Sequence, residues 1–329
     1  MKFTNNIDPE KIITEDQLKN YAAPLSETEE KKCKNAIKMI RDAMKLIGYT
    51  DGGKDIRIYE ANTYAYALDL RSNTGKNITI LIQGSYANNT NVKTKSDVDI
   101  ATILESTFIP EFRSEITSKD YNFTDGTFTA KELKDEVEIA LNKKFNNEGV
   151  ERKDKSIKVH GNSYRVDSDV VPAYRFRDYR DDYDILVDNY VGGIEIRPDS
   201  GGKIINYPEQ HIKNGKVKNI QTNYYFKKHV RILKKMKYIM QDLNYSSANN
   251  VSSFGLESLF WNIPNEVFMR YTILRFTFDE LLTFLDSNLH LLYNYKEANG
   301  VKLLFPTLTE LENYKRFIKD LNELYEYDI

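Results

Sequence analysis

The feature that most constrains this chain is a Gly-Ser pair followed, after eleven residues, by two aspartates. An apolar run that ends at Gln83 predicts a strand before Gly84-Ser85, and Asp97 and Asp99 open the next apolar run. Because successive side chains of a strand point to opposite faces, both aspartates are expected on one face. Paired carboxylates repel unless a cation neutralises them, and their hard oxygens suit Mg²⁺. The glycine allows a polyphosphate to approach the backbone closely, and Ser85 offers a hydroxyl and an N–H to the phosphate oxygens. The pattern therefore predicts a phosphate-binding site beside a metal site.

Apolar runs around this pair predict a sheet. Val98, Ile100 and Ile103 are expected on its buried side, and Pro172 is expected to end the last strand. A short Gly161-Asn162 turn is suited to a hairpin between the last two strands. The predicted strands are residues 55–70, 78–83, 98–104, 156–160 and 163–171. This pattern indicates a mixed or antiparallel sheet.

A long helix precedes the sheet. Residues 26–48 carry apolar side chains at the three- and four-residue spacing of an amphipathic helix. Ser26 and Glu29 predict a capping box at its beginning, and Gly48 is expected to end it. Cys33 lies on the apolar stripe, which favours a buried structural thiol over a reactive one.

The rest of the chain changes from strands to helices. Thr129 and Glu132 predict the beginning of a second helix that packs on the sheet. Residues 175–215 are polar and contain several glycines, which predicts a small β-rich excursion. Helical periodicity then predicts four further helices at residues 222–243, 253–261, 264–286 and 308–325. The fold class is therefore α+β, with a division after residue 215.

Composition excludes several classes of protein. Lysine and arginine total 47 against 49 aspartates and glutamates, so the overall field lacks the footprint of a protein that binds long nucleic acid, while a local basic cleft stays open. One cysteine cannot form an intrachain disulfide, and four scattered histidines lack zinc-site spacing. The N-terminus lacks the apolar core of a signal peptide, and no run of about 18 apolar residues could span a bilayer. We expect a cytoplasmic protein without a membrane role.

A metal site of this kind needs a third carboxylate on a neighbouring strand. Asp167 and Asp169 both lie just before the apolar run that ends at Pro172. They are two residues apart, so strand periodicity places both on the same face and does not choose between them.

Gly84-Ser85, the spacing and the Asp97-Val-Asp99 segment together resemble the signature of the polymerase-β-like nucleotidyltransferases. Further matches narrow the resemblance to the bacterial cGAS/DncV-like nucleotidyltransferases, the CD-NTases, and most closely to their clade E. It covers nearly the whole chain. Besides residues 84–99, the stretches that carry it are residues 24–29, 150–157, 161–163, 208–211 and 251–254. Residues 52–77 look longer than the usual link from the first helix to the first strand, and we expect an extra hairpin there.

The resemblance implies a polymerase-β-like core, a mixed sheet with flanking helices and a long N-terminal spine helix, over residues 1–215. Residues 216–329 are implied to form a helical domain that completes the nucleotide-binding cleft. The family's third aspartate directly precedes two apolar residues and a proline, as Asp169 does. Asp97, Asp99 and Asp169 are thus the implied catalytic residues, which hold two Mg²⁺ ions that Mn²⁺ can replace.

The resemblance also implies nucleotide contacts. Lys234 would hold donor phosphates, Ser253 would assist, and Phe254 would stack on the donor base. Asn162 resembles a clade E asparagine that is linked to a preference for pyrimidine bases. Each has an ordinary alternative: Lys234 as a solvated residue of a basic helix face, Phe254 as a core residue, and Asn162 as a turn residue.

The implied activity joins two nucleoside triphosphates into a cyclic dinucleotide second messenger and releases pyrophosphate. UTP and ATP are the expected substrates, and cyclic UMP-AMP or a cyclic dipyrimidine is the expected product. The implied setting is CBASS antiviral defence, in which a separately encoded effector senses the product of a monomeric enzyme. The rival hypotheses are a nucleotidyltransferase that modifies RNA, a small molecule or a protein, and a non-catalytic nucleotide-binding module. The presence of all three aspartates argues against the second.

Overall fold

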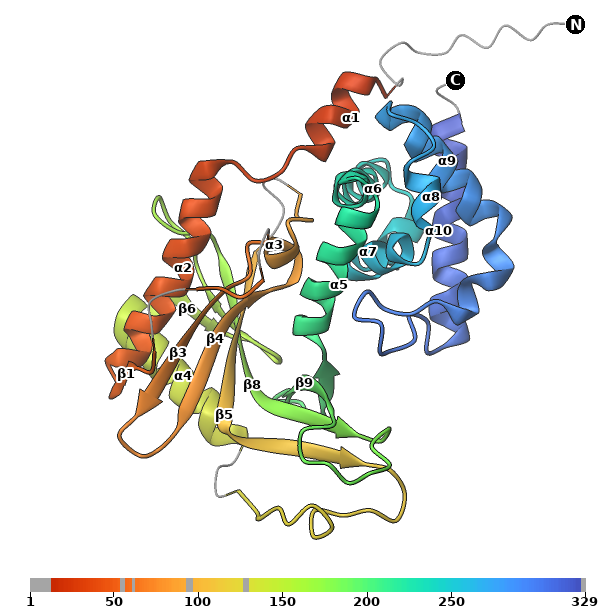
Figure 1. Cartoon of the computed structure of the whole chain (residues 1–329). Coiled ribbons are helices and arrows are strands. Elements are labelled where there is room, and N and C mark those ends of the chain that lie inside the picture. The colour runs from red at the N-terminus through yellow and green to blue at the C-terminus, as the bar shows by residue number, and fades with distance from the viewer. Residues whose placement is uncertain (1–12, 54–56, 61–62, 93–96, 127–129, 327–329) are drawn as a thin grey trace, which may run out of the picture. The chain divides into compact units, whose positions relative to one another are not determined.

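The computed structural model describes residues 13–53, 57–60, 63–92, 97–126 and 130–326 (Figure 1). The chain forms two compact units, and each is described by itself. The sheet unit comprises Leu25–Asn88 and Ser96–Ile212. The helical unit comprises Met1–Pro24, Asn89–Lys95 and Lys213–Ile329.

The sheet unit is organised by one mixed sheet whose main path runs β1-β3-β4-β5-β8-β7-β6. β5 and β8 are parallel, whereas the other pairs are antiparallel, so the predicted mixed sheet is confirmed. β2 adds to β3, and β9 continues from β8 to β10. The strands are β1 Tyr49–Asp51, β2 Arg57–Ile58, β3 Tyr66–Ser72, β4 Asn77–Gln83, β5 Val98–Phe112, β6 Val150–Arg152, β7 Ile157–Val159, β8 Ser168–Tyr179, β9 Val191–Ile196 and β10 Ile204–Asn206. The short strands β1 and β2 lie in or beside the long 52–77 stretch and pair antiparallel with β3.

Both faces of the sheet are covered by apolar contacts. The larger core includes Ile100 and Val170 and packs against helices α2 (Glu27–Lys45) and α4 (Ala130–Phe145). Figure 1 shows these two helices on the same side of the strands. The opposite face has a smaller core, which includes Ala101, Ile103 and Ala173. Ile103 was therefore expected on the wrong face, because it has the same parity as Asp97 and Asp99.

The long helix α2 follows its predicted pattern. Ser26 Oγ accepts a hydrogen bond from Glu29 N at 3.3 Å, and Glu29 Oε2 accepts one from Ser26 N at 2.8 Å, which completes the capping box. Gly48, with φ +100°, follows the end of the helix. Cys33 is buried, and burial raises the pKa of its thiol to about 12. The thiol is thus structural, as predicted.

The hairpin expected at Gly161-Asn162 is longer than a two-residue turn. β7 ends at Val159 and β8 begins at Ser168, so eight residues, 160–167, connect the two strands. Nor does Pro172 end the last strand, because β8 continues to Tyr179. Pro172 falls between residues 168–170, which pair with β7, and residues 174–178, which pair with β9. A residue without an N–H is tolerated at such a gap between partners.

The helical unit packs around a core of buried residues from α1, α6, α7, α9 and α10, among them Leu18, Phe226, Phe260 and Phe278. The helices of the C-terminal third agree with three of the four predicted ranges. The helices are α1 Glu15–Ala22, α5 Pro208–Gln221 (in this unit from Lys213 onward), α6 Tyr225–Asp242, α7 Ser253–Trp261, α8 Asn265–Phe268, α9 Leu274–Ser287 and α10 Leu308–Glu326. No helix in the described part of the chain is long and apolar enough to cross a membrane.

The predicted helix 264–286 is wrong, because the chain leaves the helical conformation between α8 and α9. Ile273 is extended, with φ −90° and ψ 125°, and a new helix begins at Leu274. Glu15, at the beginning of α1, accepts hydrogen bonds from the backbone N–H groups of Leu274 at 3.1 Å and Arg275 at 2.9 Å. These are two of the N–H groups that a helix leaves unpaired at its first turn. The cap comes from a residue some 260 positions earlier, which local periodicity does not reveal.

Besides the short helix α3 (Gly84–Asn88), two helices of the described residues escaped the sequence analysis. α1 has a capping box between Thr14 and Gln17, a signal that was present in the sequence. α5 lies partly within the stretch interpreted as a β-rich excursion, and Gly215 in its middle hides its periodicity. The expected cap of α4 at Thr129 lies outside the described residues.

We expect Glu15→Ala to destabilise the protein by about 1–2 kcal/mol, because it leaves two N–H groups of α9 without their charged acceptor. Asp16→Ala is the matched control: it also removes a charge from the first turn of α1, but among the described residues Asp16 forms an ion pair with exposed Lys19 alone. The control should cost less than about 0.5 kcal/mol. Urea unfolding of both variants measures the difference, and equal losses would contradict the long-range cap.

Candidate active site

The glycine of the Gly-Ser pair is required by its contacts. Gly84 begins the short helix α3 (Gly84–Asn88) directly after β4, with φ +68°. A Cβ atom at this position would lie 2.3 Å from Asp99 Oδ2. The backbone conformation therefore disfavours a residue with a Cβ, and the carboxylate leaves no space for one. Ser85 follows as the second, half-buried residue of the helix.

The three predicted aspartates belong to one face of the sheet. Asp99 of β5 and Asp169 of β8 are direct partners in the parallel register. Asp97 lies just before β5 begins, and its carboxylate contacts Lys158 of β7, the strand partner of Asp169. On that face the next residues of the two strands are Ala101 and Val171, which are paired with each other and belong to the smaller apolar core, so the carboxylates lie at the end of this core. Ser156 Oγ donates a hydrogen bond of 3.5 Å to Asp169 Oδ1.

A lysine that the sequence analysis missed lies among these carboxylates. Lys158 of β7 is the antiparallel partner of Asp169. Its Nζ is 2.8 Å from Asp97 Oδ2 and 3.2 Å from Asp167 Oδ2. The hydrogen bond to Asp97 and that to Asp167 raise the pKa of Lys158 well above its usual value despite its burial. The lysine therefore stays charged and neutralises part of the acidic face.

Asp167 differs from Asp169 in position and partners. It lies before β8 begins, in the 160–167 connection, and its Oδ1 accepts a hydrogen bond from Gly161 N at 2.5 Å. Burial opposes ionisation of Asp167, but the Gly161 N–H and the Lys158 ammonium outweigh it and hold its pKa below the usual value. Asp167 thus fixes the connection to the acidic face.

Asn162 takes part in a turn of this connection. Its Oδ1 accepts hydrogen bonds from the backbone N–H groups of Tyr164 at 2.9 Å and Arg165 at 3.2 Å, and its own N–H donates to Arg165 O. The side chain is exposed. These hydrogen bonds support the alternative that Asn162 is a turn residue. Its role in base choice stays a prediction.

The donor set suits a hard divalent cation. In the part of the chain that the structure describes, no three histidine, cysteine or acidic side chains come close enough together to hold a metal ion as they stand. Asp97, Asp99 and Asp169 nevertheless lie on one face, and the Lys158 ammonium already occupies the position of a cation beside Asp97. The Asp99 carboxylate occupies the space that a Cβ atom at position 84 would fill. A divalent ion would use these oxygens as ligands and would compete with Lys158 for Asp97.

The remaining predicted residues belong to the helical unit. Lys234 of α6 is buried, and its Nζ is 2.6 Å from Glu257 Oε2 and 3.1 Å from Thr90 Oγ1. Thr90 Oγ1 also donates to Glu257 Oε2 at 2.6 Å. The alternative of a solvated Lys234 is therefore wrong. Its charge is already paired in the interior, so these contacts do not favour the predicted phosphate contact.

Another lysine on the same helix is more available. Lys237, one turn after Lys234, is half-buried and has no carboxylate partner among the described residues. Burial and the nearby charge of Lys234 lower its pKa. A phosphate near Lys237 would favour its charged form and so oppose both effects, and the residues that carry the resemblance did not include this lysine.

Ser253 and Phe254 are the first residues of α7. Ser252, not Ser253, caps this helix: its Oγ accepts a hydrogen bond from Gly255 N at 2.8 Å. Ser253 thus keeps its hydroxyl for other contacts. Phe254 is 38% exposed, so the alternative of a core phenylalanine is wrong. An exposed ring at a helix start can offer a face for stacking.

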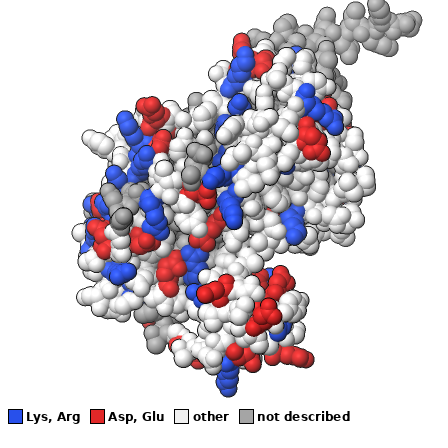
Figure 2. Space-filling model, in the orientation of Figure 1, with Lys and Arg blue, Asp and Glu red and all other residues white. Residues whose placement is uncertain are grey.

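Charges on the surface are mixed. On the face in Figure 2, acidic and basic side chains are interspersed over the described residues and form no continuous basic strip. This agrees with the near balance of 47 basic and 49 acidic residues.

Comparison with known proteins defines the class. Residues 213–326 match the cGAS/DncV-like nucleotidyltransferase C-terminal helical domain. A cyclic GMP-AMP synthase, CdnE03, of Staphylococcus schleiferi is 42% identical over 318 residues, which cover 96% of this chain and 98% of the relative. A cyclic dipyrimidine nucleotide synthase, CdnE, of Cecembia lonarensis is 36% identical over 88% of this chain and 86% of its own length. The solved Rhodothermus marinus CdnE c-UMP-AMP synthase with Apcpp and Upnpp superposes with a TM-score of 0.76 at 25% identity, covering 95% of this chain and 97% of that one.

The chain belongs to the cGAS/DncV-like nucleotidyltransferases and, within them, to the CdnE-type cyclic nucleotide synthases. It is therefore an enzyme that transfers nucleotidyl groups, and the resemblance read from its motifs is confirmed. Nucleotidyltransferases of this family are generally metal-dependent.

We expect Gly84→Ala to reduce nucleotidyl transfer about 100-fold, because its Cβ would displace the Asp99 carboxylate by a distance that reacting groups do not tolerate. Gly75→Ala is the matched control, since Gly75 also has positive φ, +85°, but a Cβ there meets nothing within 4 Å. Both variants should lose about 1 kcal/mol of stability from backbone strain. Pyrophosphate release measures activity, and equal activity of the two variants would contradict the steric argument.

Proposed function

We propose that this enzyme joins two nucleoside triphosphates into a cyclic dinucleotide at the face formed by Asp97, Asp99 and Asp169. The observation that carries the proposal is the parallel register of β5 and β8, which makes Asp99 and Asp169 direct neighbours beside Gly84. Three carboxylates on one face, next to a helix that begins with Gly-Ser, are the donor set that phosphoryl chemistry requires.

Each transfer forms a bond between an acceptor hydroxyl oxygen and the donor α-phosphorus and breaks the bond to the β-phosphate, so that pyrophosphate leaves. Ser85 donates its hydroxyl and N–H to donor phosphate oxygens. Asp169 lies on the acceptor side and receives the hydroxyl proton. A second transfer in the same place closes the ring, because both reacting ends are already held together.

Asp97, Asp99 and Asp169 hold Mg²⁺, for which Mn²⁺ can substitute, and we propose two ions. Such ions, when bound, polarise the phosphate and make the acceptor hydroxyl more acidic. Lys158 balances the acidic face before the nucleotide arrives, since it pairs with Asp97 at 2.8 Å. It also holds Asp167 in place and thereby leaves Asp169 to the reaction.

The helical unit supplies nucleotide contacts in this proposal. Phe254 stacks on a base through its exposed ring and Ser253 offers its hydroxyl. Lys234 was assigned to the phosphates from the sequence. Its ion pair with Glu257 favours a supporting role, with half-buried Lys237 as the lysine whose charge remains for a phosphate.

Two products are candidates. The first is a uridine-containing product, made from UTP and ATP or from pyrimidines alone. It is favoured by Asn162 and by the similarity to a c-UMP-AMP synthase and to a cyclic dipyrimidine synthase. The relative that is 42% identical is a cyclic GMP-AMP synthase, which favours cyclic GMP-AMP as the second candidate. In either case we propose a cytoplasmic monomer whose product activates a separately encoded effector in antiviral defence, without long nucleic acid.

Asparagine substitutions test the three metal-binding aspartates. Asp97→Asn, Asp99→Asn and Asp169→Asn should each reduce synthesis at least about 100-fold, because each removes a charge that stabilises the transferring phosphate. Asp167→Asn is the matched control and should keep most of the activity, since Asp167 binds Gly161 and Lys158. Synthesis is measured as labelled dinucleotide from each NTP with Mg²⁺. Loss in Asp167→Asn together with activity in Asp169→Asn would reverse the assignment.

Product identity tests the role of Asn162. The wild-type enzyme, incubated with all four NTPs, should give a phosphatase-resistant ring that contains uridine by mass spectrometry. Asn162→Ser should shift incorporation towards purines. Serine can still accept the turn hydrogen bonds of Tyr164 and Arg165, so the connection stays folded. An unchanged product profile would limit Asn162 to its turn.

A further inference from the structure

A pocket of about 330 Å³ lies entirely within the helical unit, at the end of α7 that is opposite to Phe254. α7 is nine residues long, which places the two ends about 12 Å apart. The pocket is at the small end of the range, about 300–1,000 Å³, of sites that hold small molecules. Its lining comes from α5 and from the stretch between the last residue of α7 and the first residue of α8: Asn214, Val217, Lys218, Gln221, Trp261, Asn262, Ile263, Pro264 and Asn265.

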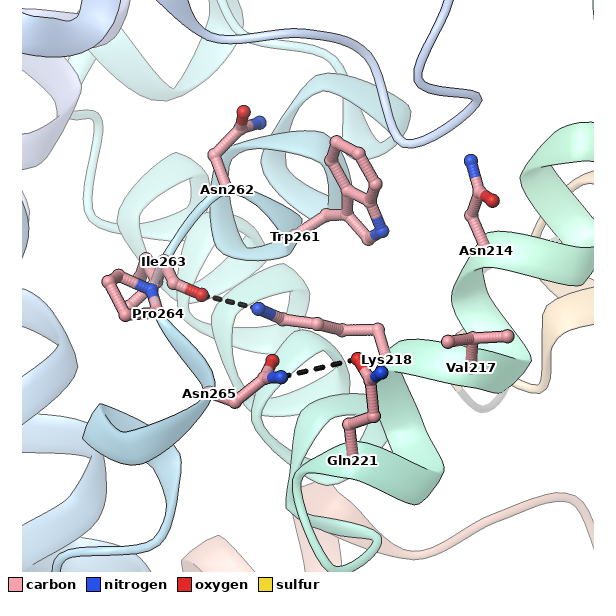
Figure 3. A pocket seen from close by; sticks show the side chains of 9 residues that line it. All are labelled: Asn214, Val217, Lys218, Gln221, Trp261, Asn262, Ile263, Pro264 and Asn265. Atoms are coloured by element: carbon pink, nitrogen blue, oxygen red, sulfur yellow. Dashed lines mark hydrogen bonds between the residues drawn. The ribbon is translucent and has the colours of Figure 1, made fainter.

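One wall of the pocket is aromatic and apolar. Figure 3 shows the indole of Trp261 above the side chain of Lys218, with Val217 on one side and Ile263 and Pro264 on the other. Trp261 is half-buried and is the only tryptophan of the chain. A large ring beside open space offers a stacking surface for a flat ligand.

A buried ammonium group supplies positive charge. Lys218 is 8% exposed, and its Nζ donates to Ile263 O and lies 5.4 Å from the ring centroid of Phe268. Burial lowers the pKa of Lys218 to about 8, although Glu266 is near enough to favour the charged form, and no carboxylate forms an ion pair with this lysine in the described residues. Burying a charge without a paired counter-charge is costly. An anionic group in the pocket would provide that counter-charge.

Amide groups around the pocket leave both donors and acceptors available. Asn262 is fully used by Ser258 and Lys296, and Asn265 Nδ2 donates to Gln221 Oε1 at 3.2 Å. Within the described residues, Gln221 Nε2 and Trp261 Nε1 remain as donors without a partner, and Asn214 Oδ1 and Asn265 Oδ1 remain as acceptors. Such a mixture matches the alternating donors and acceptors on the edge of a nucleobase.

We propose that this pocket is a second nucleotide site, separate from the aspartate face, in which Trp261 stacks on the base and Lys218 binds a phosphate. The amides of Gln221 and Asn265 read the edge of the base. A ligand with one base and one phosphate combines the three properties that the lining offers: a flat face, a polar edge and a negative charge.

The single tryptophan gives a direct test. Full-length protein in the presence of a chelator is titrated with UMP, AMP and GMP while Trp261 fluorescence is followed. At least one nucleotide should cause a saturable change. Lys218→Met should weaken binding at least tenfold, whereas Lys213→Met, an exposed lysine on the same helix, should not change it. The double variant Gln221→Ala, Asn265→Ala leaves the Lys218 contact with Ile263 intact and should weaken binding as well, so a folding defect of Lys218→Met would not remove the test.

Further arms separate this site from the aspartate face and from simple anion binding. Asp97→Asn with Asp99→Asn, and Phe254→Ala, should each leave the fluorescence titration unchanged, and loss of the signal in either would overturn the proposal. Equal affinity for inorganic phosphate alone would also overturn it, since the base would then contribute nothing. So would the absence of a saturable change with all three nucleotides. None of these results depends on cyclic dinucleotide synthesis, so the two proposals can fail independently.

Discussion

The parallel pairing of β5 with β8 is the constraint on which the aspartate face depends. It is the parallel ladder in a sheet whose other pairings are antiparallel, and it brings two strands together that are about 70 residues apart in the chain. The register Asp99 with Asp169 then follows without any further adjustment. A shift of one residue would turn one of these carboxylates into the apolar core on the other face. The large core beneath Ile100 and Val170 opposes such a shift, so the same apolar residues that stabilise the sheet also align the acids.

Charge in this molecule is compensated differently in the two units. On the aspartate face, Lys158 lies between acidic groups that remain partly exposed, with 38% exposure for Asp97 and 41% for Asp167. In the helical unit, Lys234 and Glu257 are both almost fully buried, and Thr90 shares their contact. A partly exposed pair can exchange one partner for another at modest cost, whereas removal of one member of a buried pair leaves a charge in the interior and costs about 3–5 kcal/mol. The first arrangement suits a site whose counter-ions change, and the second suits a fixed scaffold.

Much of this arrangement could be predicted from the sequence, and the failures share a cause. Local signals identified the capping box of α2, the strand β4 and the parity of Asp97 and Asp99. What local signals lacked was partners distant in the chain. Glu15 divides the predicted helix 264–286 by capping α9, and β8 continues through Pro172 because its neighbours change there. Lys158 was missed because its partners are identified only by the pairing of β7 with β8.

Gly84 carries two separate demands, a positive φ and the space taken by the Asp99 carboxylate. Only the first belongs to the backbone. In a related chain without an aspartate at position 99, no carboxylate fills the space beside position 84. A residue such as asparagine, which tolerates the left-handed conformation, could then replace the glycine. Positions 84 and 99 should therefore change together in family members that have lost catalytic activity. The residue at the first position of α3 therefore distinguishes catalytically active members from inactive ones on the basis of sequence alone.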